Sequence, residues 1–376
     1  MSFLQRILGI QEREQVMLPE SLALDLLRLK KVMQSLGVTS STLKLKRLND
    51  SEQLHRINKY LGDRLALCTA RERLGVVKAF LDADASLPAD VTGGGGDATE
   101  VRSALENGCA DLGITMTPEQ LEAIHAHLRS KPVLLGHDAH GATGQVPSLS
   151  DVPADKNYAC YNYLDLWSSP HLMEFATQKR FQDLAQAYLG CTPTLYSMNA
   201  FWSFPHRQPN KASQVFHRDW EDYRSLVIFT QLTPVDGPQD GAHYYVETSH
   251  EPERFEKSLR ARDANPADIE ALSTRDEVAI APLAMKLFGE TAHRFDGPAG
   301  RSFCGDGYGL HRANVPQSRP RLLLWMRFGN FFNDTAYKMQ IGIGNRAVAE
   351  RTRDRIPATP RHQYVFRYMT EALSAV

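Results

Sequence analysis

The chain has 376 residues, of which 42% are hydrophobic and 23% charged, as is typical of a globular protein with a large core. Its 43 Lys and Arg residues nearly balance its 44 Asp and Glu residues, and the formal net charge of -1 argues against a nucleic-acid or membrane-surface partner. No apolar run reaches the roughly 18 residues of a membrane-spanning helix, and the N-terminus lacks a signal-peptide pattern, so we expect a cytoplasmic protein. The five cysteines form no C-x-x-C pair, so any metal must be bound by His and carboxylates.

Residues 1–95 are predicted to form a helical N-terminal extension. Apolar residues recur at helical spacing in residues 19–37 and 51–83. The run "TGGGGD" then marks a boundary near residue 95, because consecutive glycines do not hold regular structure cheaply. We expect this extension to be a lid, a homodimerisation element or a docking site for a carrier-bound substrate, with residues 96–376 forming the main domain.

The main domain is predicted to begin with helices and continue with strands. Residues 100–128 show a helix, a short extended segment and a second helix that begins after the N-cap candidate Thr117, and residues 168–190 show a further helix. From Cys191 onward, short segments rich in aromatic and β-branched residues alternate with Gly, Pro, Asp and Asn turns. This pattern predicts an α+β protein with a mainly β core, a sandwich or jelly roll, interrupted by a charged, partly helical insertion at residues 251–277.

The stretch "VFHRDW" carries a candidate metal-binding pair. His217 and Asp219 are two residues apart in a predicted strand, so both side chains project from one face while Arg218 points away. Two histidines and one carboxylate form the facial triad of non-haem Fe(II) oxygenases. His311, at the end of a later predicted strand, can supply the third ligand. The alternative for the pair is a simple ion pair at the rim of the barrel.

An arginine is the expected partner of 2-oxoglutarate, if that is the co-substrate. A planar guanidinium suits the distal carboxylate because it can donate two parallel hydrogen bonds. Arg321, which opens the strand after His311, is the preferred candidate, although it could instead pair with an acidic side chain. Arg319 and Arg327 are rivals, and Arg327 would lie about 20 Å further along the same strand face.

Residues from about 100 to 330 resemble the phytanoyl-CoA dioxygenase family. "FHRDW" matches the family's H-x-D motif, and "GLHRANVPQSRPR" matches its distal histidine followed by a Pro-Arg pair. "DGPQDGAHYYVETSH" is similar to a Gly-rich turn and strand that usually end in Pro-Gly-Ser-His, although here the ending is "ETSH". The interval from His311 to Arg321 is also slightly shorter than is usual in the family.

The resemblance implies a double-stranded β-helix, a cupin-like jelly roll, with Fe(II), 2-oxoglutarate and O2 as cofactors. His217, Asp219 and His311 would be the catalytic metal ligands, and Arg321 would bind the oxoglutarate. Because halogenating members of the family generally lack the carboxylate that Asp219 supplies, we expect hydroxylation, with desaturation or cyclisation as alternatives.

The expected substrate is a small organic or amino-acid-derived metabolite in a biosynthetic pathway. Two other classes of protein are alternatives to an oxygenase. One is a cupin-like hydrolase or isomerase that uses zinc or manganese, against which Arg321 argues. The other is a non-catalytic metabolite-binding barrel, against which the intact ligand set argues.

Further residues are candidates for the walls of the site. Asn199 and Trp202 lie on the predicted strand before the metal strand, where we expect Asn199 to contact 2-oxoglutarate and Trp202 to contact the substrate. Trp220 and Tyr223 follow the metal ligands and are candidates for the substrate pocket, although Trp220 could instead pack in the core.

The segment "LLGHDAHG" holds His137 and His140 between glycines. No second ligand pair follows at the spacing of a zinc site. We therefore interpret this segment as a loop at the edge of the pocket or in solvent, in preference to a second metal site.

Overall fold

The structure is a computed structural model that describes residues 97–139, 141–205, 212–219, 222, 224–273, 277–329 and 345–376. The predicted N-terminal extension, residues 1–95, lies outside the described residues, and so do Trp220, Tyr223 and His140.

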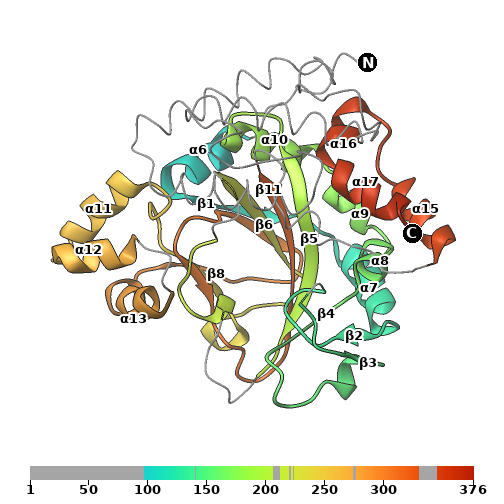
Figure 1. Ribbon diagram of the computed structural model, residues 1–376, viewed down its shortest axis with the longest axis horizontal. Coiled ribbons are helices and arrows are strands. Elements are labelled where there is room, and N and C mark those ends of the chain that lie inside the picture. Colours follow the sequence, from blue (N-terminus) through green and yellow to red (C-terminus); the bar gives the residue numbers. More distant parts are fainter. Residues whose placement is uncertain are drawn as a thin grey trace, which may run out of the picture.

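Two antiparallel sheets form the centre of the protein (Figure 1). The large sheet has eight strands in the order β1-β9-β6-β11-β5-β4-β2-β3, and the small sheet has three in the order β10-β7-β8. The strands of the large sheet are β1 (Cys109–Ile114), β2 (Val133–Leu134), β3 (Gln145–Val146), β4 (Tyr158–Cys160), β5 (Thr194–Ser203), β6 (Ser225–Gln231), β9 (Arg301–Asp306) and β11 (Arg321–Gly329). Those of the small sheet are β7 (His243–Tyr245), β8 (His293–Phe295) and β10 (His311–Ala313). The prediction of an α+β protein with a β core is confirmed, and the structure shows that both sheets of this core are antiparallel.

Helices surround the sheets in two groups. The first group precedes or follows the main strands and comprises α6 (Ala98–Asn107), α7 (Pro118–Arg129), α8 (Tyr163–Trp167), α9 (Leu172–Ala176), α10 (Lys179–Leu189), α15 (Arg346–Arg353), α16 (Pro360–Val365) and α17 (Arg367–Ser374). The second group interrupts the strands, lies apart at the left of Figure 1, and comprises α11 (Pro252–Arg260), α12 (Pro266–Leu272) and α13 (Glu277–Phe288). The helical insertion predicted for residues 251–277 is therefore longer in the structure, because α13 extends it to Phe288. Short 3-10 helices are η1 (Leu149–Asp151), η2 (Ala212–Gln214) and η3 (Pro238–Asp240).

The helix boundaries show the local signals that the sequence predicts. Thr117 caps α7 in a capping box with Gln120: each side chain accepts a hydrogen bond from the backbone of the other residue. Residues 98–129 form the predicted order of helix, extended segment and helix, as α6, β1 and α7. Among the described helices, none combines the length and apolar character needed to cross a membrane.

The two faces of the large sheet bury different groups of residues, as β11 shows. Leu322 and Leu324 pack into the main core together with the first group of helices. Leu323 and Trp325 alternate with them and pack into a separate cluster with Phe201 of β5. We call this second face, the one that carries Leu323 and Trp325, the inner face of the large sheet.

Aromatic side chains join the inner face to the small sheet. Phe303 of β9 stacks on Phe295 of β8, with ring centroids 4.3 Å apart and planes at 6°. Phe229 of β6, which is paired with Phe303 in the large sheet, has its ring centroid 5.1 Å from that of Phe303. Apolar rings therefore line the space between the sheets on this side.

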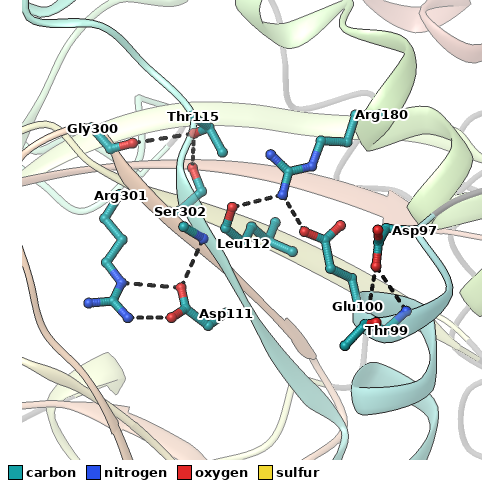
Figure 2. A network of polar contacts seen from close by, with 11 residues as sticks. Asp97, Thr99, Glu100, Asp111, Leu112, Thr115, Arg180, Gly300, Arg301 and Ser302 are labelled. Atoms are coloured by element: carbon teal, nitrogen blue, oxygen red, sulfur yellow. Dashed lines mark hydrogen bonds and ion pairs between the residues drawn. The ribbon is translucent and has the colours of Figure 1, made fainter.

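Polar contacts fix β1 along the edge of the large sheet (Figure 2). Arg301 of β9 donates hydrogen bonds from Nε and Nη2 to the two carboxylate oxygens of Asp111. The hydroxyls of Thr115 and Ser302 lie 2.6 Å apart, and Arg180 of α10 donates to a backbone carbonyl of β1 over 2.8 Å. Strand β1 thus covers the backbone edge of β9, which would otherwise be available for pairing with another chain.

Candidate metal centre and co-substrate site

The three predicted metal ligands lie together. His217, Asp219 and His311 each offer one ligand atom, and these atoms lie within 4.8 Å of one another. Nε2 of His217 is 3.8 Å from Oδ1 of Asp219, and Nε2 of His311 is 3.8 Å from Oδ2 of the same carboxylate. The segment predicted as a strand forms only an isolated bridge at His217. The side chain between the two ligands, Arg218, still points away from them and donates to the carbonyl of Ser249 over 2.7 Å.

Backbone pairing brings the ligands together from distant parts of the chain. His217 and His311 face each other in an antiparallel bridge, and each N–H donates to the other residue's carbonyl over 3.1 Å. The N–H of Asp219 donates to the carbonyl of Gly307 over 2.7 Å. The candidate metal centre is therefore held by the same hydrogen bonds that align the strand segments.

Both imidazoles are oriented by carbonyl groups of their own segments. Nδ1 of His217 lies 2.8 Å from the carbonyl oxygen of Val215, and Nδ1 of His311 lies 2.8 Å from that of Gly309. Because a carbonyl can only accept, each Nδ1 must carry the hydrogen, which leaves the lone pair of each Nε2 directed toward Asp219. This arrangement is typical of metal-binding histidines.

The electrostatics favour the protonation states that a metal requires. Burial, with the nearby His217, lowers the pKa of His311 to about 4, so its ring is neutral at pH 7. Burial alone would raise the pKa of Asp219, but the charge of Arg327 holds that pKa below its usual value. A neutral imidazole and an ionised carboxylate are the forms that bind a divalent cation.

Arg321 is buried with part of its guanidinium unpaired. Its side chain lies on the inner face with only 2% of the residue exposed, and its Nη1 donates to the carbonyl of Gly241. Neither Nε nor Nη2 has a hydrogen-bond partner among the described residues. Burial lowers the pKa of Arg321 to about 10, because the charged form is less well solvated in the protein interior than in water. Such a site fits an anionic ligand that would complete the hydrogen bonds.

The two rival arginines have other partners. Arg319 is exposed and forms ion pairs with Asp236 at 2.6 Å and Asp240 at 3.2 Å. Arg327 lies on the inner face further along β11, where its Nη2 is 3.4 Å from Oδ2 of Asp219. Arg327 therefore neighbours the candidate metal ligands rather than the position of Arg321.

Asn199 and Trp202, the two predicted site residues on β5, point to opposite faces. Asn199 is paired with Trp325 on the inner face and donates from Nδ2 to Oδ2 of Asp138 over 3.3 Å. Trp202 is paired with Leu322, and its Nε1 donates to the hydroxyl of Tyr161 over 2.8 Å on the side of the helices. The structure therefore brings Asn199 to the inner face and places Trp202 away from it.

His137 lies between aromatic rings of the inner face. Its ring centroid is 4.3 Å from that of Phe201 and 4.9 Å from those of Trp325 and Tyr158. Its Nε2 is buried and has no hydrogen-bond partner among the described residues. Burial, together with the charge of Arg327, lowers the pKa of His137 to about 4. The structure therefore places His137 among aromatic rings on the inner face and not in solvent.

His243 of β7 is a second inner histidine, and nothing in the sequence analysis singled it out. It is 6% exposed, and its ring centroid lies 5.6 Å from that of His311 and 4.8 Å from that of Phe229. The only available signal was one polar residue within the apolar stretch "AHYYV" of a predicted strand. That signal is weak, because polar residues at strand positions usually face solvent.

No known protein-family model matches the sequence, and no curated protein matches it. Solved structures that are similar to the chain include the non-heme alpha ketoglutarate dependent carbocyclase SnoK from nogalamycin biosynthesis, at 16% identity and a TM-score of 0.40, covering 62% of this chain and 83% of that chain. Another is the epimerase SnoN in complex with Fe3+, alpha ketoglutarate and nogalamycin RO, at 17% identity and a TM-score of 0.39, covering 61% of this chain and 82% of that one. EctD from S. alaskensis with bound Fe has 15% identity and a TM-score of 0.40, covering 62% of this chain and 76% of that one. The function proposed below rests on the geometry of this chain's own residues.

Proposed function

We propose that the protein is an Fe(II)- and 2-oxoglutarate-dependent oxygenase whose two sheets form a double-stranded β-helix. Its reaction is the hydroxylation of an unactivated C–H bond in a small organic or amino-acid-derived metabolite, with desaturation or cyclisation as alternative outcomes. The observation that carries the proposal is the convergence of His217, Asp219 and His311, each imidazole presenting its Nε2 to the shared carboxylate.

The donor set fits ferrous iron. Two imidazole nitrogens and one carboxylate form a facial triad that leaves coordination positions free for a co-substrate and oxygen. When bound, iron and 2-oxoglutarate supply the oxidising chemistry, and the protein binds and orients the reactants. His217 and His311 would hold the metal through Nε2, and the carboxylate of Asp219 would lower the net charge of the centre.

Arg321 fits the distal carboxylate of 2-oxoglutarate. Its two unpaired atoms, Nε and Nη2, form one edge of the guanidinium, which is the edge that binds a carboxylate through two parallel hydrogen bonds. Apolar rings, among them Phe229 and Phe303, line the space between the two sheets. A dicarboxylate co-substrate gives this open edge of Arg321 a ligand, which supports an oxygenase over a zinc or manganese hydrolase that uses the same three metal ligands.

An anaerobic titration with Fe(II) and 2-oxoglutarate, followed by visible absorption, tests the proposal. Chelation of a 2-oxo acid by ferrous iron gives a weak charge-transfer band, which we expect in the wild type and not in His311→Ala, which lacks one of the two imidazole ligands. Arg321→Ala should need far more 2-oxoglutarate to reach the same band. Arg319→Ala is the matched control, because its exposed side chain pairs with Asp236, and it should behave as the wild type.

The outcomes separate the alternatives. Binding of the metal without a band at any 2-oxoglutarate concentration would favour a hydrolase or isomerase that uses the same ligands. Failure to bind any divalent metal would favour a non-catalytic binding barrel.

A further inference from the structure

His243 occupies the wall between the candidate metal centre and Arg321. Its ring lies nearly parallel to that of His311, at 22° and 5.6 Å between centroids. On the other side, the guanidinium of Arg321 donates to the carbonyl of Gly241, two residues before His243 in the chain. A ligand that extends from the metal to Arg321 would therefore pass close to this imidazole.

The imidazole nitrogens of His243 make no hydrogen bond to any described residue. The residue is 6% exposed, and its backbone pairs with Ala313 of β10 and Phe295 of β8. Its other neighbours are apolar rings, with Phe229 at 4.8 Å and Phe303 at 5.1 Å between centroids. Buried polar side chains are normally hydrogen-bonded, and leaving one unpaired costs free energy. A phenylalanine would fill the same space without this cost.

The imidazole of His243 can donate a hydrogen bond through its N–H to an anionic ligand.

We propose that His243 is a co-substrate-binding residue that donates a hydrogen bond to the distal carboxylate of 2-oxoglutarate, beside the guanidinium of Arg321. This inference rests on the proposed function and extends it, because it adds a residue of this chain to the oxoglutarate site. It also accounts for a polar residue on an otherwise apolar wall. The competing explanation is that the ring only supports His311 by stacking.

Paired variants and paired ligands distinguish these explanations. His243→Phe keeps an aromatic ring beside His311 and removes both nitrogens, whereas His243→Asn restores a hydrogen-bond donor. His293→Phe is the matched control, since it is the same substitution at a half-exposed histidine of β8 that contacts Glu247. Each Fe(II)-loaded protein would be titrated anaerobically with 2-oxoglutarate and with pyruvate, a 2-oxo acid that lacks the distal carboxylate. Fe(II) affinity would be measured separately by calorimetry.

We expect His243→Phe to bind 2-oxoglutarate roughly 10- to 100-fold more weakly, the usual effect of losing a hydrogen bond to a charged group. Its affinities for pyruvate and Fe(II) should match those of the wild type, and His243→Asn should recover part of the loss. The control should bind all three as the wild type does.

Unchanged 2-oxoglutarate affinity in His243→Phe would overturn the inference and leave the proposed function standing. An equal loss for pyruvate would also overturn it, because the ring would then act on the chelating end or on His311. If the wild type binds Fe(II) but no 2-oxoglutarate, the proposed function fails and the inference with it. Should the phenylalanine variant not fold, as judged by its thermal transition, His243→Leu provides the same comparison with a smaller side chain.

Discussion

Gly309 packs against the hydroxyl of Tyr245 so closely that a Cβ atom at this position would collide with it. Tyr245 is buried, and its hydroxyl donates to the carbonyl of Asp306 over 3.2 Å, so the ring cannot easily move aside. The carbonyl of Gly309 is also the group that accepts the Nδ1 hydrogen bond of His311. The orientation of this candidate metal ligand therefore depends on the absence of a side chain two residues before it.

Gly309→Ala is expected to weaken metal binding without touching a ligand. The collision with Tyr245 must shift the backbone and, with it, the carbonyl that orients His311. Loss of such an orienting partner typically costs about 10- to 100-fold in metal affinity. Calorimetry with Fe(II) under anaerobic conditions measures the effect. Gly141→Ala is the matched control, because a Cβ there meets no atom within 4 Å. Equal affinities for the two variants would show that the carbonyl has no orienting role.

Arg321→Met is expected to stabilise the protein in the absence of ligands while abolishing tight 2-oxoglutarate binding. The substitution removes a buried cation with two unpaired nitrogens and keeps an unbranched apolar chain of similar length. Replacing poorly compensated buried charges by apolar side chains is often neutral or stabilising, by about 1–4 kcal/mol. Thermal unfolding with and without 2-oxoglutarate measures both effects.

A second buried arginine provides the contrast for Arg321. Arg361 donates to the carboxylate of Asp183 over 3.0 Å, and both side chains are largely buried. Arg361→Met removes one of the two cations that contact this carboxylate, because Lys179 also pairs with Asp183, and should lower the free energy of unfolding by roughly 1–3 kcal/mol. If Arg321→Met is destabilised to the same degree as Arg361→Met, the guanidinium of Arg321 must form stabilising contacts within the protein. Its hydrogen bonds would then not be available to a bound anion.

The sequence allowed the triad to be predicted because its residues follow local rules. His217 and Asp219 share a face through the two-residue period of an extended chain, and His311 lies at the end of a strand with a recognisable sequence. Arg321 was preferred because it opens the next strand, and the structure shows its unpaired guanidinium edge at that point.

The remaining inner residues depend on facts that a single sequence does not contain. Both faces of β5 are buried, so apolar alternation could not indicate which face Trp202 occupies. His137 reaches the inner face only because its loop folds back onto β5, and His243 is visible only when the small sheet is placed against the large one. In each case the missing information is the packing of distant segments, which residue type and spacing do not determine.

The stability of the metal-free protein should fall as the pH drops from about 6.5 to about 4, in part because of His137. In the folded protein the pKa of His137 is lowered to about 4, so the unfolded chain takes up a proton in this range that the folded protein does not. The lost stability from this group is up to about 3 kcal/mol. His137→Phe should therefore show a shallower decline between pH 7 and pH 5, measured by urea unfolding. An identical pH dependence in the two proteins would mean that the buried imidazole is protonated when folded.

Asn199→Ala is expected to lower stability by about 1–3 kcal/mol and to leave 2-oxoglutarate affinity unchanged. Its amide donates to Asp138, the residue after His137, so we expect it to anchor the loop that places this histidine on the inner face. Tyr163→Phe is the matched variant, because the hydroxyl of Tyr163 donates to the other oxygen of Asp138 over 2.7 Å from the helix side. Both variants should lower the thermal transition and have the same oxoglutarate affinity. If only Asn199→Ala weakens oxoglutarate binding, the amide contacts the co-substrate directly, and the loop contact is secondary.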